Sequence, residues 1–394
     1  MRWTAIQLGS REHYAIPVAL HASGQLDCCI TDTWLSTSVA ALVRPVLPSF
    51  AGRRHEELPD AKVRSNTMGR LMTDWRLRRQ RKSPWSTILE RNEWFGAWAA
   101  AECAHIGSSA VFSYSYTARL PFAEARRRNA RCILGQIDPG PREQEFVEEQ
   151  TTAYRHLAPP NDKIPDLYWQ RWREEVELAD KIVVNSPWSA KLLVEAGVDA
   201  AKLVEIPLVY EPGGSMEHGA RSMEKRPNTR LQALFLGSVI LRKGVGQLFD
   251  AIKMIRNEPV DFVFAGPVGV KIPNEISALD NVRFLGPVDQ ATAGRLYREA
   301  DIFLFPTLSD GFGLTQLEAL GHGIPVVASK NCGRVVEHGT NGLLLPAVTP
   351  EAIAEAVMQF LRDPQLARQL GARARVPEAF RPERLSAALA LLKY

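Results

Sequence analysis

The second half of the chain alternates short apolar runs with amphipathic stretches of helical length. The runs are apolar at every position, which is typical of strands buried on both faces of a parallel sheet. The stretches between them, such as GVGQLFDAIKMIR and DQATAGRLYREA, have the spacing of helices that cover such a sheet. The expected strands span 231–237, 260–266, 281–286, 301–306, 324–329 and 342–346.

The first half has the same alternation with longer insertions. Ser186 followed by Pro187 predicts a helix that begins directly after a strand, with the serine as its cap. Two doubly wound α/β domains that face each other are therefore expected, with ligands in the cleft at the carboxyl ends of the strands. The strands expected in this half span 3–9, 109–115, 130–137 and 181–186.

Tryptophan and linker composition indicate where one domain ends. All nine tryptophans lie at or before Trp188, and residues 211–230 are polar and rich in glycine and proline. We predict an amino domain over 1–210, a linker over 211–230 and a carboxyl domain over 231–375. Residues 376–394 are expected to form a C-terminal helix that returns to the amino domain.

The composition of the 394 residues is that of an ordinary globular protein, with 45% hydrophobic and 23% charged residues. The five cysteines are scattered without a C-x-x-C pair, which speaks against a disulfide framework or a zinc site. No D-x-D pair and no phosphate loop of the G-x-x-x-x-G-K-[ST] type occurs, so no metal site is expected. Because no apolar run reaches roughly 18 residues and the N-terminus does not resemble a signal peptide, we expect a cytosolic protein.

The strongest chemical signal is PTLSDGFGLTQLEALGHGIPVVAS, residues 306–329. A buried strand ends at Pro306, a turn with Gly311 and Gly313 follows, and a helix is expected to begin near Leu314. The amides at such a helix start favour a phosphate. Asp310 and Glu318 flank the turn, where carboxylates can accept from sugar hydroxyls. Taken alone, the segment also fits a tight turn with a surface carboxylate.

A second signal follows the first strand of this domain, in LFLGSVILRKGVG (234–246). Arg242 and Lys243 follow the strand that ends at Gly237, and two cations at this position suit a diphosphate. A solvated pair in a loop is the alternative. The segment FAGPVG (264–269) adds a third strand end at the same sheet edge.

In order and spacing, these segments resemble the carboxyl domain of retaining glycosyltransferases of family 4 (glycosyl transferases group 1), over about residues 181–375. The resemblance implies the type B fold and a nucleoside diphosphate sugar as donor, without a metal or other cofactor. The family has two glutamates separated by seven residues; here the pair is Asp310 and Glu318, the first shorter by one methylene. The resemblance implies that Asp310 contacts the transferred sugar and Glu318 the ribose, as the catalytic pair, and that Lys243 binds phosphate.

The resemblance extends to further positions. The family often has arginine directly after the glycine that matches Gly237, whereas this chain has Ser238, so Arg242 is expected to supply the second cation. The other expected phosphate contacts are Gly237, Ser238, Gly313, Leu314 and Thr315. The expected contacts to the sugar or nucleotide are Gly266, Val288, Gly311, Phe312 and Glu318.

The amino half is less similar to the family. Gly9, Arg11 and His13 occupy the place of the family's first loop, and Asp138 follows a strand in GQIDPG. His13 fits a plain polar contact at a helix start or a role in the site, and Asp138 fits a turn cap or a contact to the acceptor. Ser115 and Tyr116 stand where many relatives carry a histidine.

These observations predict transfer of a sugar, with the retention implied by the family, to a saccharide or lipid-linked acceptor, as in polysaccharide or glycoconjugate biosynthesis. Two rivals stay open. One is a nucleotide-sugar epimerase or phosphorylase on the same fold. The other is a non-catalytic nucleotide-sugar-binding protein, since the first glutamate and the amino-domain histidine of the family are replaced.

The net charge is +4 with an isoelectric point near 8.8, but the basic residues are concentrated. From Arg44 to Arg91 the chain carries 12 Lys or Arg against 5 Asp or Glu. A solvated arginine-rich face is one interpretation; peripheral contact with an anionic membrane, at its inner face, is the other. No recognition motif supports nucleic acid as a partner. The interleaved residues are Trp75, Trp85, Trp94 and Trp98 with Arg70, Arg76, Arg78, Arg79, Arg81 and Lys82.

Overall fold

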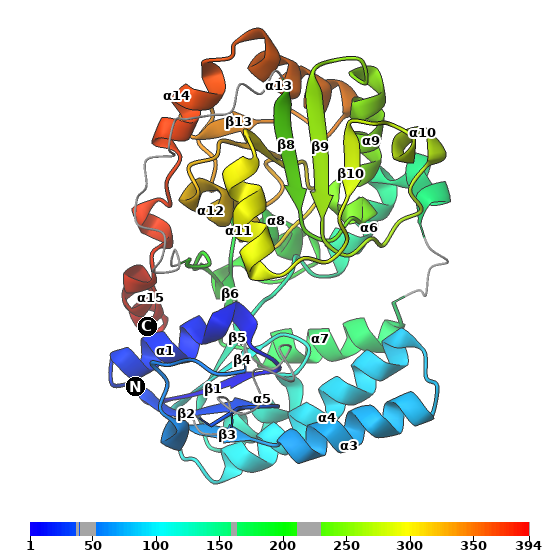
Figure 1. Cartoon of the computed structure of the whole chain (residues 1–394). Coiled ribbons are helices and arrows are strands. Elements are labelled where there is room, and N and C mark those ends of the chain that lie inside the picture. The colour runs from blue at the N-terminus through cyan, green and yellow to red at the C-terminus, as the bar shows by residue number, and fades with distance from the viewer. Residues whose placement is uncertain (37–38, 40–52, 159–163, 211–229, 394) are drawn as a thin grey trace.

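The computed structural model describes residues 1–36, 39, 53–158, 164–210 and 230–393. Within them the chain forms two parallel β-sheets, each covered by helices on both faces (Figure 1). The first sheet has seven strands in the order β3-β2-β1-β4-β5-β6-β7, and the second has six in the order β10-β9-β8-β11-β12-β13. The predicted pair of doubly wound α/β domains is therefore confirmed.

The described strands of the two sheets have the following bounds. The first sheet contains β1 Trp3–Gln7, β2 Leu26–Thr31, β3 Val63–Ser65, β4 Ala110–Tyr114, β5 Arg131–Gly135, β6 Lys181–Val184 and β7 Leu203–Glu205. The second contains β8 Leu231–Leu236, β9 Val260–Ala265, β10 Val282–Phe284, β11 Ile302–Phe305, β12 Val326–Ala328 and β13 Gly342–Leu344.

The α-helices divide between the halves in the same way. Those before residue 210 are α1 Ala15–Ala22, α3 Thr67–Arg79, α4 Pro84–Ala104, α5 Arg119–Arg127, α6 Pro141–Gln150, α7 Asp166–Leu178 and α8 Pro187–Glu195. Those after residue 230 are α9 Val245–Met254, α10 Asn274–Ser277, α11 Gln290–Glu299, α12 Thr315–Gly321, α13 Pro350–Arg362, α14 Leu366–Arg373 and α15 Pro382–Ala390.

The ten strands expected from the apolar runs are all present, and three further strands are not predicted by those runs. The pattern misses β3 and β7 because both are three-residue edge strands that are only partly buried. The third, β2, is a central strand whose apolar character rests partly on Cys28 and Cys29. The predicted cap is confirmed, since the Ser186 hydroxyl accepts from the Ser189 amide at 3.1 Å.

Strand order places a switch point in each sheet. The first strand of the carboxyl sheet, β8, lies between β9 and β11, and β1 likewise lies between β2 and β4. At such points the chain leaves neighbouring strands in opposite directions, so their carboxyl ends leave room for a ligand. The segments that follow β8 and β11 are the ones that carry Lys243 and Asp310.

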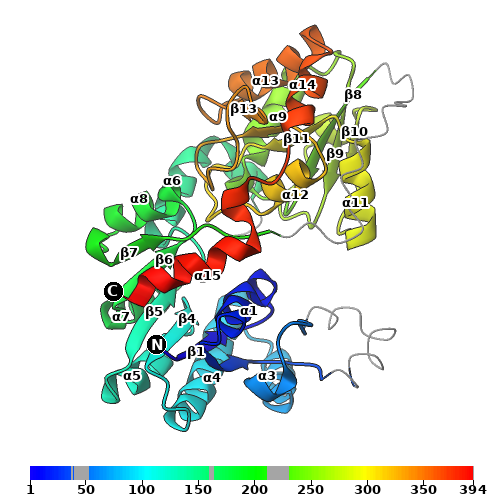
Figure 2. The ribbon, with the colours of Figure 1, turned by 90° about the vertical axis from the view of Figure 1, so that its left-hand side faces the viewer.

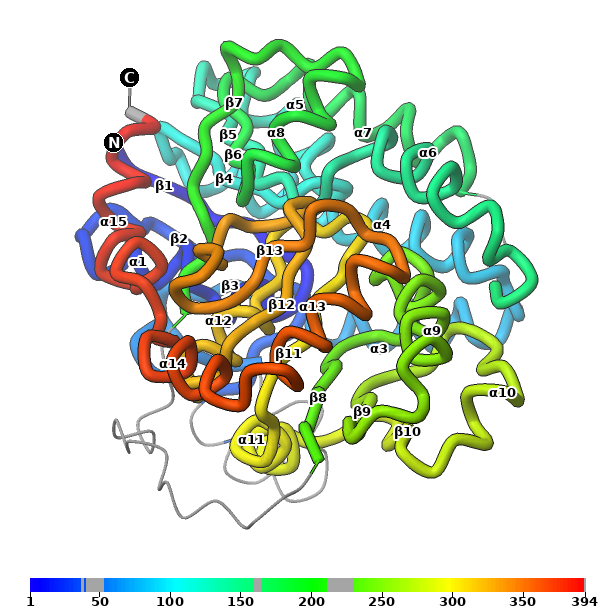
Figure 3. The backbone as a smooth tube through the Cα atoms, turned by 90° about the horizontal axis from the view of Figure 1, so that it is seen from above, coloured from blue at the N-terminus to red at the C-terminus, as the bar shows by residue number. Residues whose placement is uncertain are grey.

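Two stretches of chain connect the halves outside the predicted linker. After α6, the 3₁₀ segment Thr152–Leu157 packs on α9: Tyr154 donates to Asp250 at 2.9 Å, and Leu157 joins the carboxyl core. At the other end of the chain α15 packs on α1, where the Ser386 hydroxyl donates to the Ala19 carbonyl at 3.2 Å (Figures 2 and 3). The predicted linker, 211–230, lies outside the described residues except for its last residue, and the predicted domain boundaries stay predictions.

A buried carboxylate holds the start of α5. Glu175, on α7, accepts from the amides of Tyr116, Ala118 and Arg119 at 2.6, 2.7 and 3.1 Å. The Ala118 and Arg119 amides would otherwise lack a partner, because the first amides of a helix have no intrahelical acceptor, and the Tyr116 amide belongs to the turn before the helix. The side chain of Glu175 thereby fixes the turn that leads from β4 into α5.

We expect Glu175→Gln to lower the free energy of unfolding by about 2 kcal/mol or more, because its NH₂ group would face a backbone amide that now donates to a side-chain oxygen of Glu175. Urea denaturation measures the change. Glu174→Gln is the matched control, since the Glu174 side chain is 41% exposed and lies 3.6 Å from Arg119; we expect a change within about 0.5 kcal/mol. Equal stability of the two variants would show that Glu175 does not hold this turn.

Candidate donor site at the second switch point

The turn after β11 packs directly against the segment after β8. The carbonyl of Arg242 accepts from the Leu308 amide at 2.9 Å and from the Thr307 hydroxyl at 3.2 Å. In return, the Arg242 guanidinium donates from Nη1 to the Ser309 carbonyl at 2.8 Å. Two segments that are 60 to 70 residues apart in sequence are thus locked together at one sheet edge.

Lys243 and Asp310 form an ion pair at the centre of this arrangement. Their side chains are 16% and 15% exposed, so the pair is largely but not completely withdrawn from solvent. Burial by itself would raise the pKa of Asp310, but Lys243 and Arg242 beside it hold that pKa below its ordinary value. Asp310 is therefore ionised at neutral pH, and its charge holds the Lys243 ammonium group at this edge of the sheet.

Two glycines of the turn are required by the geometry. Gly313 has φ +86°, and a β-carbon there would come within 2.4 Å of the Phe305 ring. At Gly311 a β-carbon would lie 2.8 Å from the carbonyl oxygen of Ile137, in the amino half. Close approach of the two halves at this turn therefore depends on the absence of a side chain.

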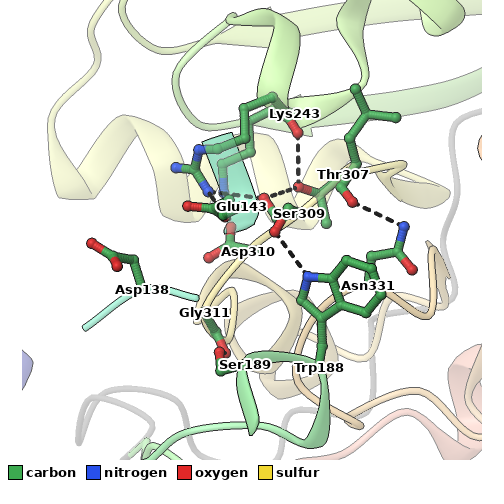
Figure 4. Close-up of polar contacts among 12 residues, drawn as sticks. Asp138, Glu143, Trp188, Ser189, Lys243, Thr307, Ser309, Asp310, Gly311 and Asn331 are labelled. Atoms are coloured by element: carbon green, nitrogen blue, oxygen red, sulfur yellow. Dashed lines mark hydrogen bonds and ion pairs between the residues drawn. The ribbon is translucent and has the colours of Figure 1, made fainter. Parts of the chain in front are cut away.

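Side chains from the amino half complete the site (Figure 4). The Trp188 indole donates to the Ser309 hydroxyl at 2.8 Å, and the Ser189 hydroxyl donates to the Gly311 carbonyl at 3.2 Å. Glu143, in the first turn of α6, places Oε1 3.6 Å from Arg242 Nη1. The turn that carries Asp310 is thus bound from both sides of the domain interface.

Glu318 lies in α12, one turn beyond the helix start, as predicted. Its Oε2 accepts from the Tyr297 hydroxyl at 2.8 Å, and the Tyr297 ring stacks on His322 with centroids 5.0 Å apart. Burial raises the pKa of Glu318, while Tyr297 and the charge of His13 lower it. Since His13 comes from the amino half, the two halves also approach each other at this carboxylate.

The remaining residues that the sequence predicted to contact the donor lie either at the carboxyl edge of the sheet or in the core. Gly237 and Ser238 directly follow β8, and Thr315 and Leu314 lie at the start of α12, all at the expected sheet edge. Gly266 follows β9, and Val288 packs partly buried against the carboxyl core. Phe312 is 2% exposed and packs on Phe380, so its side chain is part of the core.

The first loop of the amino half is strained. Glu12, His13 and Tyr14 have φ values of +48°, +50° and +64°, a region that residues other than glycine rarely adopt. Such strain concentrates at functional sites. Gly9 is held by Asp32, whose Oδ1 accepts from the Gly9 amide at 2.8 Å, and Arg11 is exposed.

Burial of Glu12 raises its pKa to about 7. The residue lines a cavity at the carboxyl ends of the amino strands, together with Tyr114, Gln136 and Asn185. The carboxyl group therefore lies in the amino half at the same sheet edge as Gly9 and His13. No pattern in the sequence singles it out, because the signal is its backbone conformation rather than its residue type.

Asp138 caps a turn, which is one of the two roles that the sequence allows for it. Its Oδ1 accepts from the Gly140 amide at 2.9 Å and from the Tyr116 hydroxyl at 2.7 Å. Tyr116, which with Ser115 replaces the family's histidine, stacks on Tyr168 with centroids 4.3 Å apart. The contact of Asp138 to an acceptor stays a prediction.

Several residues of the site were not predicted from the sequence. Thr307 and Ser309 belong to the glycine-containing turn itself, but nothing in its sequence singled out their hydroxyl groups. The others come from segments without a glycine-rich motif, and tertiary packing brings them to the turn. The one available signal was at Glu143, an acidic residue in the first turn of a helix that follows a Gly-Pro pair. These residues are Glu143, Trp188, Ser189, Tyr297, Thr307 and Ser309.

Among the described residues, no group of three or more His, Cys, Asp or Glu side chains is arranged to hold a metal ion. The cations at the site are the side chains of Arg242 and Lys243, whose partners are oxygen atoms of the same turn. The arrangement can therefore bind an anion through protein cations and helix amides, and a sugar through the Asp310 and Glu318 carboxylates.

Two facing doubly wound domains with such an anion site at one switch point are the form of the glycosyltransferase type B fold, and this chain has that fold. Residues 230–363 match the family model described as "Glycosyl transferases group 1", which confirms the resemblance seen in the sequence.

Curated glycosyltransferases match about half of the chain. A D-inositol 3-phosphate glycosyltransferase of Streptomyces griseus is 30% identical over 223 residues, which cover 50% of this chain and 47% of the relative. The chain thus spans about half the length of the curated relatives it matches.

Solved structures cover the whole chain. Sucrose-phosphate synthase from Thermosynechococcus elongatus has a TM-score of 0.69 at 20% identity, over 100% of this chain and 98% of that one. The Anabaena protein HepE, solved with UDP and glucose, has a TM-score of 0.63 at 14% identity, over 100% and 99%. At these identities the likeness supports the fold alone.

Proposed function

We propose that this protein is a metal-independent glycosyltransferase that uses a nucleoside diphosphate sugar as donor. The observation that carries the proposal is the Lys243–Asp310 pair with Arg242, at the switch point of the domain that matches the family. A cation pair beside a carboxylate can bind the two ends of the bond to be broken, the diphosphate and the sugar.

Charge development determines the role of each residue. As the bond between sugar and diphosphate breaks, negative charge grows on the leaving phosphate oxygens. We assign the stabilisation of that charge to Lys243, Arg242 and the amides at the start of α12. Asp310 accepts from hydroxyls of the transferred sugar, and Glu318, oriented by Tyr297, accepts from the ribose.

Retention and the acceptor are proposed on separate grounds. Retention follows from the family resemblance, and we propose a saccharide or lipid-linked acceptor bound on the amino half beside Gly9, Arg11, His13 and Asp138. The name of the Streptomyces griseus relative supports a polyol phosphate as one acceptor to test. We further propose that the protein acts in the cytoplasm, in polysaccharide or glycoconjugate biosynthesis.

Two measurements test the proposal. A thermal-shift screen of UDP-, GDP- and ADP-linked hexoses should raise the melting temperature with one donor class. Mass spectrometry of the same donor with candidate acceptors should then detect free nucleoside diphosphate and a glycosylated product. A binder would show the first effect without the second, and an epimerase would convert the donor without releasing diphosphate.

Excess EDTA should leave the transfer rate unchanged, because protein cations replace a metal in this account. Loss of activity in EDTA that manganese restores would contradict the metal-independent mechanism.

An exposed apolar stripe on α3 supports contact of the amino half with a membrane. Met68, Leu71, Met72 and Trp75 are 68%, 48%, 65% and 62% exposed, and they share one face of the helix. The Arg79 guanidinium lies 5.4 Å from the Trp75 ring. Apolar side chains flanked by arginine are the composition of a helix that lies in an anionic lipid surface.

The structure corrects which tryptophans could take part. Only Trp75 of the four is exposed: Trp85 packs on Tyr168, and Trp94 and Trp98 pack against the core of the amino domain. Among the described residues, no helix combines the length and apolar character needed to span a bilayer. Any membrane contact through this segment would therefore be made by the surface of α3.

We expect the protein to float with anionic vesicles at low salt and to be released by high salt, since each basic residue near such a surface contributes about 1 kcal/mol. The double variant Met72→Ser, Trp75→Ser should reduce the lipid-bound fraction about tenfold or more. Met254→Ser, which changes a 56% exposed methionine at the end of α9, is the control. Flotation that is absent, or equal with neutral lipid, would refute the docking proposal.

A further inference from the structure

Glu143 is a buried acid beside Arg242, one of the two cations of the proposed donor site. It lies in the first turn of α6, directly after the Asp138–Gly140 turn, and its side chain is 13% exposed. Its Oε1 is buried and has no hydrogen-bond partner among the described residues. The nearest cation, Arg242 Nη1, is 3.6 Å away, beyond hydrogen-bond distance, and already donates to the Ser309 carbonyl.

Charges of both signs surround this carboxyl group. Arg242 faces it from the segment after β8, Asp310 and the Ser309 hydroxyl from the turn after β11, and Asp138 from the end of β5. Burial is the largest influence and raises the pKa of Glu143 to about 7; Arg242 and Ser309 lower it, and the two aspartates raise it. The carboxyl group therefore changes its protonation state near neutral pH.

A bound donor would favour the protonated form of Glu143. The diphosphate of a nucleotide sugar carries two negative charges, and Arg242, whose Nη1 lies 3.6 Å from Glu143 Oε1, would hold it beside that carboxyl group. A second anion there would be repelled, because opposition of like charges in a partly buried site is costly. A neutral carboxyl group instead offers an O–H donor, which a phosphate oxygen can accept.

We infer that Glu143 is a further donor-binding residue, which hydrogen-bonds the diphosphate as a neutral acid, so that binding of a nucleotide sugar takes up a proton at this carboxyl group. The inference rests on the proposed function. A purely structural role would be different. In that role an ionised Glu143 would position Arg242 by its negative charge, and the effect would weaken when the acid is protonated.

Proton uptake is directly measurable. Titration calorimetry of the full chain with the UDP-, GDP- or ADP-linked hexose selected by the thermal-shift screen, in two buffers of different ionisation enthalpy, gives the number of protons taken up. A nucleotide sugar has both phosphates esterified, so it lacks the terminal phosphate ionisation near pH 6. We expect uptake approaching one proton at pH 8, and an affinity that falls about tenfold per pH unit above the pKa of Glu143.

The isosteric variant Glu143→Gln distinguishes this acid from others that titrate nearby, such as Glu12. Its amide donates as the neutral acid does, so we expect affinity within about threefold of the parent at pH 6.5 and a clear loss of both the proton uptake and the pH dependence. Glu145→Gln, the same change on the exposed side of α6, should behave like the parent.

Two results would overturn the inference while leaving the proposed function intact. One is binding without proton uptake in the parent, and the other is unchanged uptake in Glu143→Gln. A tenfold weaker affinity of Glu143→Gln at pH 6.5, with an unchanged melting temperature, would instead assign Glu143 the anionic positioning role. Failure of every donor in the screen to bind the parent would overturn the proposed function and this inference together.

Discussion

Lys243→Ala is expected to lower the rate of glycosyl transfer by about 10²–10³-fold, the loss seen when one donor to a developing oxyanion is removed. The ammonium group is held at the donor site by Asp310 and lies 4.9 Å from the centroid of the Phe305 ring. Its removal takes away the charge that meets the leaving diphosphate and leaves Asp310 without its ion-pair partner. Initial rates at saturating donor measure the effect.

The control for this variant is Lys253→Ala on the same domain. Lys253 lies in α9 and pairs at 2.5 Å with Asp250, away from the turn after β11. We expect it to retain the parent rate within about twofold. Activity of Lys243→Ala within about threefold of the parent would show that this lysine does not bind the diphosphate.

Asp310→Asn should be similarly severe, with a loss of about 10²-fold or more, because an amide offers one acceptor atom where the carboxylate offers two. The substitution also breaks the pair with Lys243, so the ammonium group has a neutral partner. The rate of transfer and the affinity for the donor should both fall. Transfer by Asp310→Asn at the parent rate would show that this carboxylate does not touch the sugar.

Asp310→Glu is the informative counterpart, since it restores the carboxylate length found in the family. We expect it to retain activity and to exceed the parent if the extra methylene brings the oxygen atoms closer to the sugar. The two variants also differ in acid stability. Because the pKa of Asp310 is lowered in the folded state, its ion pair stabilises the fold above the ordinary pKa of aspartate and loses that effect as the pH falls through the lowered value. Asp310→Asn should lack this acid-side transition.

The fold could be predicted from the sequence because both sheets are parallel and buried on both faces. Buried parallel strands are apolar throughout, so their runs stand out between amphipathic helices. The edge strands β3 and β7 were not predicted, because a three-residue strand that is half exposed has no such run. Strand order, by contrast, depends on which runs pair in space, and periodicity carries no information about that.

The meeting of the segments after β8 and β11 was predictable for a related reason. Their groups follow strands directly, so Lys243 and Asp310 had to meet at one edge once the sheet was assumed parallel. Glu143 and Trp188 could not be found in this way, because they reach the turn from the other domain. Their positions depend on the domain interface, where Gly311 lets the backbone of Ile137 approach.

The central claim is that this protein transfers sugar from a nucleoside diphosphate donor bound at the Lys243–Asp310 site. The most direct test compares product formation by the parent and by Lys243→Ala. Parent and Lys243→Ala should each be incubated with the donor selected by thermal shift and with candidate acceptors, and nucleoside diphosphate and product should be quantified together by mass spectrometry. The account predicts equal amounts of both products from the parent and a loss of about 10²–10³-fold in the variant. No donor-dependent product from the parent, or full activity in Lys243→Ala, would contradict it.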